Sequence, residues 1–473
     1  MENKSEKILI GHKLKRLRLD LGITQLEMAN EIGISPSYLN LLESNQRPVT
    51  VQLLFKLGQV YNIDLKEFAD DESGKIAIEL SEIFADPLLS SVKISKREIR
   101  QLASASPSIA NSISTLYSAY TKVRETLQSD NLSENLKITT SPLLNVREFL
   151  EKSGNHFPLL ETAADNCRKE ANVDNSTIFS DLTTFLLNKY NIKTEIIPQP
   201  TMGNVLRKND PHRNRLLLSE ILREPQRVFQ VSIQIALIAY DKVIEKIIEE
   251  SLMKDLETIQ LLRITLAGYF AGSLMMPYSR FKDSATQCRH DIDILARRFS
   301  SSFEQVCHRL TTLNRKSERG IPFFFLRVDE AGHISKRLSA AGLQFARQGG
   351  SCGRWIPHQA FRTPGKILAQ NSELEEGQRF FTIARTVSQP RTSDSIIGTP
   401  LFSVALGCEI KHAENIVYAD GLALGKSIPV VPIGLSCKTC ERNNCQHRGE
   451  PPLGREIKFD PNLRYAGLFE FSN

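Results

Sequence analysis

Apolar residues recur at helical spacing through the first seventy positions and predict a run of short helices. In residues 8–21 the leucines Leu14, Leu17 and Leu21 share one side, the signature of an amphipathic helix. The basic residues of this segment are expected on the opposite side: Lys13, Lys15, Arg16 and Arg18. Residues 50–62 predict a further helix, followed by a short one from Asp64.

Residues 24–43 predict two helices around a tight turn. Thr24 and Glu27 have the spacing of a capping box, and Leu26, Ala29 and Ile32 are expected to form the buried face of the first helix. Gly33 tolerates the left-handed conformation that ends a helix. Ser35 is then a cap for a second helix with Pro36 at its first position: Leu39 and Leu42 point inward, whereas Ser37 and Asn40 point outward. This is the helix-turn-helix layout.

These residues resemble the Cro/C1-type helix-turn-helix domain, with five helices over residues 8–69. The specific matches are Gln25 at the start of one helix, the turn Gly33-Ile34-Ser35, and Glu43 at the end of the next helix. The resemblance implies a double-stranded DNA partner and a set of DNA-contacting positions. Gln25 and Arg47 are expected on backbone phosphate, Ser37, Tyr38 and Asn40 against the major groove, and Ser35 in the same surface. The alternative is a helical pair used only for packing. Residues 1–70 hold nine Lys/Arg and nine Asp/Glu, so modest non-specific affinity is expected.

A helical connector is expected over residues 75–128, with an apolar stripe formed by Leu116, Tyr117, Tyr120, Val123 and Leu127. The stripe suits either a packed core or the dimer helix that a binder of paired half-sites needs. Residues 128–141 are polar and are interpreted as a linker. Residues 142–277 then predict a mainly helical domain with strands at 194–197 and 215–218.

Residues 227–241 and 266–277 resemble the ImmA/IrrE-type metallopeptidase domain. Active members carry H-E-x-x-H on a helix, two zinc-binding His and a Glu that activates water. Aligned on Phe229, the three positions are Ile233, Gln234 and Leu237 in this chain, and Leu266 stands where an acidic ligand is expected. The resemblance therefore implies a degenerate fold without peptidase activity, used as a ligand pocket or a dimer platform.

Residues 278–473 predict an α+β domain of the kind that senses small molecules. Helices are expected over 280–313, a strand-like run at 321–329 with Phe323–Phe325 buried, and further strands at 366–370, 379–387, 401–407 and 427–435. Several sequence segments resemble the C-terminal domain of the short-chain fatty acyl transcriptional regulator family: RFSSSFEQVCHRLTTL, PFFFLRVDEAGHISKR, GGSCGRW, VYADGL and CKTCERNNC. With the two preceding domains in order, the resemblance covers nearly the full chain and implies an effector related to acyl-CoA.

Three cysteines, Cys437, Cys440 and Cys445, lie within nine residues and predict a metal site. Cys408, Cys352, His412 or His447 is a candidate fourth ligand. Zinc, an iron–sulfur cluster and three reduced thiols without metal all remain open. His290, His308 and His333 lack ligand spacing and are expected to be hydrogen-bonded surface or core residues. Lys336 and Arg337 suit either a CoA phosphate or a surface ion pair.

The chain of 473 residues is long enough for several domains. Charged residues make up 24% and the net charge is +6, which is ordinary for a globular protein. The sequence lacks a run of 18 apolar residues and a signal-peptide core, so we expect no membrane segment and a cytoplasmic location.

The fold class expected is multidomain: all-α helix-turn-helix, mainly α middle and α+β C-terminal domain. The expected function is a homodimeric transcriptional regulator; the alternatives are a metallopeptidase that cleaves a partner and a phage- or antitoxin-type repressor.

Overall fold

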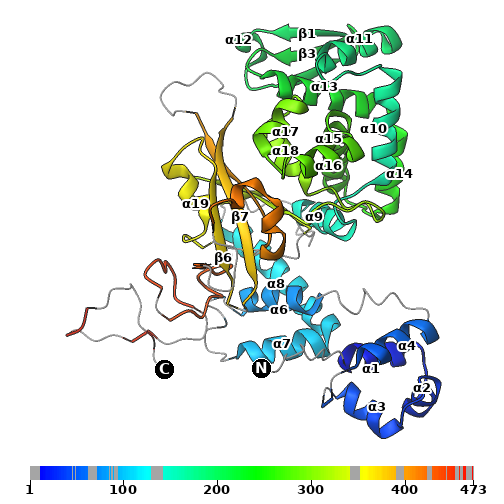
Figure 1. Cartoon of the computed structure of the whole chain (residues 1–473), viewed down its shortest axis with the longest axis vertical. Coiled ribbons are helices and arrows are strands. Elements are labelled where there is room, and N and C mark those ends of the chain that lie inside the picture. Colours follow the sequence, from blue (N-terminus) through cyan, green and yellow to red (C-terminus); the bar gives the residue numbers. More distant parts are fainter. Residues whose placement is uncertain are drawn as a thin grey trace. The chain divides into compact units, whose positions relative to one another are not determined.

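The computed structural model (Figure 1) divides the chain into two compact units, which are described one at a time. The first unit holds residues 1–136 with 453–456, and the second holds 137–452 with 457–473. The structure describes the chain from residue 11 to residue 471 except for residues 45, 48, 62–71, 85, 87–88, 90–93, 129–141, 341–351, 376, 390–398, 423–428, 444, 453–456, 459–461 and 465–470.

The helix-turn-helix of the first unit forms as its local signals predict. Its helices are α1 (Gly11–Asp20), α2 (Gln25–Glu31), α3 (Pro36–Glu43) and α4 (Val51–Tyr61). The capping box is complete, because the Glu27 N–H donates to Thr24 Oγ1 and the Thr24 N–H donates to Glu27 Oε2 at 2.7 Å. Ser35 Oγ accepts from the Tyr38 N–H at 3.1 Å, and Gly33 has φ +63° in the turn. The short helix expected from Asp64 lies outside the described residues.

Two details of the predicted apolar faces are wrong. Leu26 is 59% exposed and Leu21 is 45% exposed, whereas Met28 is fully buried. Met28, Ala29 and Ile32 share a face, and Leu26 lies two residues, about 200°, away from Met28. Among the residues described in this domain, those buried in its core are Leu14, Met28, Ala29, Ile32, Leu39, Leu42, Val49, Leu53 and Leu57.

Arg18 is buried, contrary to the outward position expected for it. Its Nε donates to Glu43 Oε1 at 2.7 Å and its Nη2 donates to Glu43 Oε2 at 3.1 Å. Arg18 lies one turn after Leu14 on α1, so it shares the inward face, and Glu43 of α3 supplies the opposite charge that makes this burial tolerable. The pair ties the first helix to the end of α3.

The connector helices of the first unit have a core of their own. They are α6 (Glu72–Ile83), α7 (Lys96–Ala105) and α8 (Pro107–Gln128), and residues such as Leu80, Ile99 and Ala103 are buried between them. Of the stripe expected on α8, Tyr117 donates to Asp86 at 2.8 Å, but Leu116 is 73% exposed. The side chains of Val123 and Leu127 lie outside the described residues.

The second unit begins with helices around a small sheet. The helices are α9 (Pro142–Lys152), α10 (Pro158–Glu170), α11 (Ile178–Tyr190), α12 (Gln199–Met202), α13 (Glu224–Ala239), α14 (Asp241–Glu250), α15 (Leu256–Met275), α16 (Tyr278–Gln287), α17 (Ile292–Arg298) and α18 (Phe303–Leu310). The sheet has the order β1–β3–β2, from β1 (Lys193–Ile197), β3 (Arg215–Ser219) and β2 (Arg207–Asp210). The predicted strands β1 and β3 are parallel, and β2, a short polar strand without an apolar pattern, was not predicted.

A larger sheet follows in the same unit, with the order β5–β4–β8–β7–β6–β9. Its strands are β4 (Phe324–Asp329), β5 (Ile334–Ser339), β6 (Leu368–Glu373), β7 (Arg379–Ser388), β8 (Leu401–Glu409) and β9 (Val431–Pro432). Beside it lie α19 (Ile356–Gln359) and 3₁₀ turns at Ala360–Arg362, Ile410–Asn415 and Val417–Ala419. The strand predicted at 427–435 is only two residues long in the described part, and β5 was missed because Ser, Lys and Arg interrupt its pattern.

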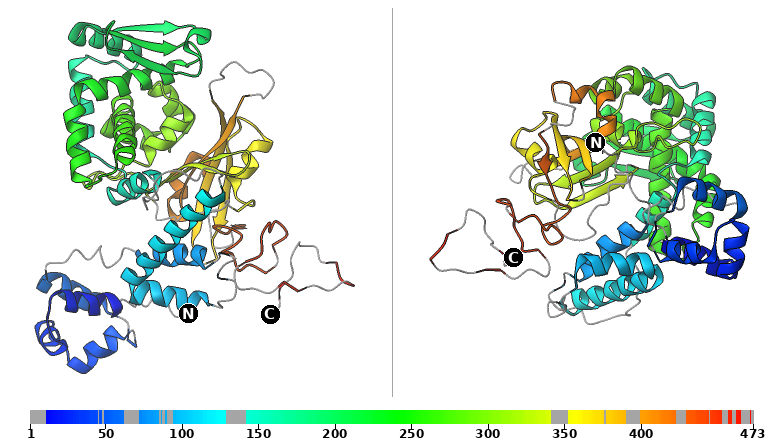
Figure 2. Two further views of the ribbon diagram at one scale, coloured as in Figure 1. Left: turned by 180° about the vertical axis from the view of Figure 1, so that it is seen from behind. Right: turned by 60° about the horizontal axis from the view of Figure 1, so that its bottom comes forward.

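Alternate residues of the larger sheet enter two different cores, as expected for period-2 side chains. Phe325, Phe381 and Leu406 pack into the core of α9–α18, whereas Phe324 and Phe380 pack with Trp355 on the opposite face. The helices and one sheet face therefore share a continuous core. Figure 2 shows the green helices beside the yellow strands of the larger sheet. No single helix of the described residues is long and apolar enough to cross a membrane, although α15 and α16 meet that test as a bent pair.

A buried ion pair joins three helices of this core. The guanidinium of Arg309 on α18 donates to both carboxylate oxygens of Glu161 on α10, at 2.7 and 2.9 Å. Arg309 also donates to the Met276 carbonyl at 2.9 Å, and the Tyr269 hydroxyl on α15 donates to Glu161 at 2.6 Å. Burial alone would raise the pKa of Glu161, but the charge and hydrogen bonds of Arg309 lower it.

We predict that Arg309→Met will destabilise the second unit by about 3–5 kcal/mol, because Glu161 would remain charged in an apolar core. Arg309→Met with Glu161→Gln should recover part of that loss. Denaturant unfolding followed by circular dichroism measures the effect. The control is Arg289→Met, which removes an exposed pair with Asp420 and should change stability far less, because solvent screens that pair. Equal losses for Arg309→Met and Arg289→Met would contradict the prediction.

The Arg18–Glu43 pair gives a pH prediction for the first unit. Burial alone would raise the pKa of Glu43, but hydrogen bonds from Arg18 and Gln25 bring it below the ordinary 4.5. A carboxylate with a lowered folded-state pKa stabilises the fold above its unfolded pKa and loses that contribution as the pH falls through the folded value. The protection of α1 and α3 amides against hydrogen exchange, relative to the intrinsic rate at each pH, should therefore decrease below about pH 4.5. In Glu43→Gln this decrease should be smaller; an unchanged profile would refute this role.

Candidate functional site

The outer face of α3 presents the residues expected to contact DNA. Ser35, Ser37 and Asn40 are exposed, and Tyr38 is half-buried against the helix-turn-helix core. Arg47, which follows α3, is exposed as well. The capping hydroxyl of Ser35 fixes the first turn of α3, so these side chains stand on a rigid helix.

Gln25 at the start of α2 is held by the same carboxylate that binds Arg18. Its Nε2 donates to Glu43 Oε2 at 2.8 Å. The sequence did not predict this contact, which joins residues 18 positions apart. Glu43 thus links α1, α2 and α3, and this link sets the angle between the two helices of the motif.

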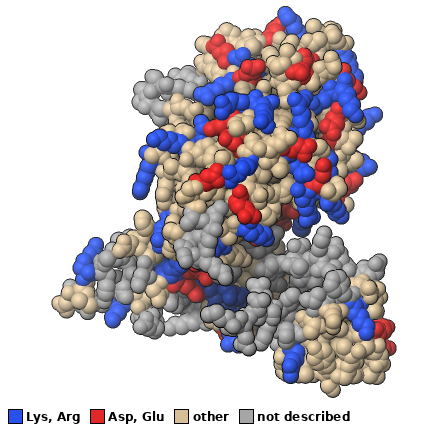
Figure 3. Space-filling view, viewed as in Figure 1, with Lys and Arg blue, Asp and Glu red and all other residues tan. Residues whose placement is uncertain are grey.

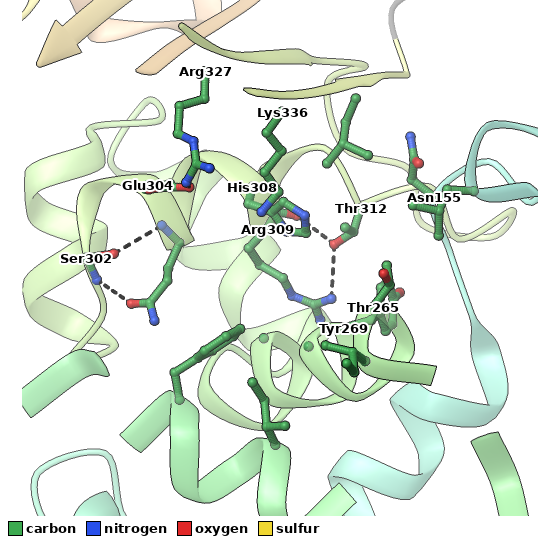
Figure 4. Close-up of a pocket in the computed structure, with 18 of the residues that line it drawn as sticks. Asn155, Thr265, Tyr269, Ser302, Glu304, His308, Arg309, Thr312, Arg327 and Lys336 are labelled. Carbon is green, nitrogen blue, oxygen red and sulfur yellow. Dashed lines mark hydrogen bonds and ion pairs between the residues drawn. The ribbon is translucent and has the colours of Figure 1, made fainter. Parts of the chain in front are cut away.

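The second unit contains a cavity of about 540 Å³ between its helices and the larger sheet. That volume suits a small-molecule site. Residues from α9, α13, α15, α18, β4 and β5 line it, so it unites positions from Leu143 to Gln389. Figure 4 shows α15 on one side, with Thr265 and Tyr269, and Arg327 and Lys336 entering from the opposite side.

One wall of the cavity is apolar. It is formed by side chains of α13 and α15 that include Phe229, Ile233, Leu261 and Ile264. Gly272 contributes no side chain to this wall, and a Cβ added there would meet nothing within 4 Å. The cavity therefore reaches the backbone of α15 at this position. An acyl or other hydrocarbon group would lose its contact with water against this surface.

The opposite wall is basic. Among the described residues that line the cavity, Arg147, Arg309, Arg327, Lys336 and Arg337 are cationic and Glu304 is the acid. Arg327 is paired with Glu304 at 3.0 Å, and Arg309 is neutralised by Glu161. Lys336 has no hydrogen bond or ion pair to the described part of the chain, so the alternative of a surface ion pair is wrong for this residue. Its Nζ lies 5.6 Å from the centroid of the Phe325 ring.

His308 on α18 belongs to the same wall and packs edge-on to Phe325, with ring centroids 6.0 Å apart. Burial, together with the positive charge of Lys336, lowers the pKa of His308 well below 6.5, so the ring is neutral at pH 7. Within the described structure its ring nitrogens have no hydrogen-bond partner, which corrects the expectation stated above. His290 and His333 do have partners, at the Asn415 carbonyl and at Asp329.

The positions that resemble a peptidase site are filled by packing residues. Ile233 and Gln234 on α13 and Leu266 on α15 are buried, and Leu237 is half-buried against the same core. Ile233 lines the cavity. Where an active member would present imidazole and carboxylate groups, this chain presents hydrocarbon and one amide.

The cysteine segment is organised by an arginine. Arg448 donates to the carbonyls of Cys437 and Cys440, each at 3.0 Å. Burial raises the pKa of Cys440 to about 11 and that of Cys408, which lies in β8, to about 12. Among the described residues, no three His, Cys, Asp or Glu side chains gather as ligands of one metal ion would. Zinc or an iron–sulfur cluster bound by Cys437, Cys440, Cys445 and Cys408 stays a prediction.

Charged side chains of both signs are interspersed over the face shown in Figure 3, which agrees with the mild net charge of +6. A uniformly basic surface of the kind that holds DNA through charge alone is not visible on that face.

Three family models match successive parts of the chain. A helix-turn-helix model matches residues 14–68, and a model for an IrrE N-terminal-like domain matches residues 187–311. A model described as "Short-chain fatty acyl coenzyme A regulator, C-terminal" matches residues 312–469. The order is the one that the sequence resemblance implied.

Curated relatives match the chain over nearly its full length. The "Propionyl-CoA carboxylase regulator" of Cereibacter sphaeroides is 35% identical over 97% of this chain and 98% of its own. The "HTH-type transcriptional regulator RamB" of Mycobacterium tuberculosis is 33% identical over 96% and 97%. A solved "Mycobacterium tuberculosis transcriptional regulator" has a TM-score of 0.66 and 35% identity, covering 70% of this chain and 100% of that one. The chain therefore belongs to the short-chain fatty acyl coenzyme A regulator family and is a DNA-binding transcriptional regulator.

Proposed function

We propose that the cavity of the second unit binds a short-chain acyl-CoA and that this ligand controls DNA binding by the first unit. The observation that carries the proposal is the pairing of an apolar wall on α13 and α15 with a basic wall on α18, β4 and β5. A thioester with a small hydrocarbon group at one end and phosphates at the other has the complementary chemistry. The name of the C-terminal family model and that of the propionyl-CoA carboxylase regulator support this ligand class.

The two walls suggest how the ligand is oriented. The acyl group fits the space beside Gly272, Phe229 and Ile264, where contact with water would be lost. The pantetheine arm and phosphates extend toward the side that carries Arg327, Lys336 and Arg337. A neutral His308 can donate or accept a hydrogen bond at the thioester carbonyl or an amide without adding charge.

In the first unit, we propose that Ser37, Tyr38 and Asn40 contact base edges in the major groove while Gln25 and Arg47 contact phosphate. The protein acts as a homodimer in this proposal, because one short helix recognises too few base pairs for a specific operator. The exposed Leu116 on α8 is consistent with a contact between two copies. The operator would be a pseudo-palindrome with half-sites about 10 base pairs, or a multiple of that, apart.

The same proposal places the protein in the cytoplasm, with the DNA it regulates, and assigns it no peptidase activity. Ile233, Leu237 and Leu266 offer no donor atom to zinc, and the amide of Gln234 cannot take up a proton from water as a carboxylate does. The middle domain thus retains the peptidase-like fold as a scaffold for the cavity.

For DNA recognition we predict that Asn40→Ala weakens operator binding by about 1–3 kcal/mol and leaves binding to unrelated DNA unchanged. Gln25→Ala should weaken binding to both DNA types to a similar degree, because phosphate contacts carry no sequence information. Fluorescence anisotropy with operator and scrambled duplexes at one salt concentration measures both. Unaltered operator affinity in the two variants would exclude the proposed contacts.

For the effector we predict that Gly272→Leu weakens binding of propionyl-CoA at least about tenfold, because the new side chain fills the open space on α15. The helix itself should be stabilised, since Gly is a poor helix former by about 1 kcal/mol. Gly272→Ala, which adds a single carbon, is the control and should change affinity much less. Calorimetric titration of the full-length chain with propionyl-CoA measures these affinities. Equal affinities in wild type and Gly272→Leu would mean that the ligand does not bind in this cavity.

A further inference from the structure

Lys336 differs from other lysines of the second unit in its surroundings. It lies on β5, half-buried in the cavity wall, and within the described structure no carboxylate pairs with it. By comparison, Lys189 is paired with Glu170 at 2.5 Å, and Lys193 is paired with Glu195 at 3.0 Å. An amine without a counter-ion in a cavity wall does not contribute a stabilising ion pair, so its presence there calls for a chemical explanation.

The neighbours of Lys336 act on its charge in opposite directions. Its Nζ lies over the face of Phe325, a contact that favours the ammonium form, and His308 packs against the same ring. The charged and titratable groups that line this cavity are His308, Glu304 and Arg309 near α18, Tyr269 on α15, Arg327 on β4, Arg337 on β5 and Arg147 on α9. Burial and the charge of Arg327 lower the pKa of Lys336, with Glu304 acting in the opposite direction. A larger fraction of this amine is therefore unprotonated at neutral pH than for an exposed lysine.

We propose that Lys336 is an acylation site, at which an acyl-CoA bound in the cavity transfers its acyl group to the lysine amine. This inference rests on the proposed function, since it needs a thioester in the cavity. A desolvated lysine beside a bound electrophile has the two properties that nucleophilic amines require, an available lone pair and proximity.

The reaction balances without any further reactant. The neutral Lys336 nitrogen attacks the thioester carbonyl carbon, a C–N bond forms, and the C–S bond breaks. The nitrogen loses one proton, which the departing CoA thiolate takes up, so the products are an amide on Lys336 and free CoA thiol. His308 lines the same wall (Figure 4) and its neutral ring adds no charge beside the reacting groups.

Acylation would change the cavity in a lasting way. It removes the positive charge of Lys336 and leaves the acyl group attached inside the cavity after CoA has departed. The modified chain would then record an earlier exposure to acyl-CoA, whereas a reversibly bound ligand reports only its present concentration.

The test incubates full-length protein with propionyl-CoA and follows acylation by intact-mass and peptide-mapping spectrometry. We expect one acyl group, located at Lys336, at a rate at least about tenfold above that of the exposed Lys208 on β2, as expected for a bound reactant. The rate should increase with pH as the amine loses its proton. Lys336→Arg should remove the single acyl group expected per chain. The matched control Lys208→Arg should still acquire that acyl group at Lys336. Acylation spread evenly over exposed lysines would overturn the proposal.

A second measurement separates this inference from the proposed function. A propionyl-CoA analogue in which a methylene group replaces the thioester sulfur can bind but cannot transfer its acyl group. If wild-type protein binds the analogue and Lys336 stays unmodified by propionyl-CoA, the acylation site is refuted and the effector site stands. If the analogue does not bind, the effector site itself fails. Peptide mapping of the wild-type protein shows which lysine carries the acyl group, so the test of the acylation site does not depend on whether Lys336→Arg folds.

Discussion

The second unit depends on one fully desolvated ion pair, Arg309 with Glu161. Two charges in an apolar core are tolerated only when each finds several partners, and here both carboxylate oxygens and three guanidinium nitrogens are bonded. The pair fixes α10, α15 and α18 relative to one another, and Tyr269 extends the same network. Because Tyr269 and Arg309 also line the 540 Å³ cavity, the interaction that holds the helices together forms part of the cavity wall.

A fold that once held a metal can lose its ligands and keep its shape for the same reason. The helix positions that would carry zinc ligands face a packed interior, and hydrocarbon fills such positions without a desolvation penalty. In this chain Ile233 and Leu266 do so, and Ile233 also lines the cavity. The cavity then differs from a catalytic cleft in its chemistry: hydrocarbon faces cationic side chains, an arrangement suited to holding an amphipathic anion.

Local signals were predicted well from the sequence, and long-range contacts were not. The capping box at Thr24, the Ser35 cap and the Gly33 turn involve residues at most three positions apart, so the sequence contains all the information they need. Burial of Arg18 depends on Glu43, 25 positions away, and the strand β5 forms only because β4 pairs with it. The cavity unites α9 with β5 and α18, and no spacing rule connects Arg147 to Lys336. Ile233 was singled out only through a resemblance, as one position of a lost peptidase site, and Phe229 only as the residue on which that alignment was anchored.

The place of the cavity limits how a ligand can act on the protein. Its walls come from α9, from the part of the chain matched by the IrrE-like model and from the part matched by the acyl-CoA regulator model, so a molecule bound there would contact both matched parts. A ligand shifts an equilibrium only by the difference in its affinity for two states. A change in the packing of α18 against β4 and β5 would alter the contacts of Arg327, Lys336 and His308 at once, whereas a movement elsewhere in the unit would leave them intact. Under the proposed function, the junction between that helix and those strands is where a bound acyl-CoA would favour one conformation over another.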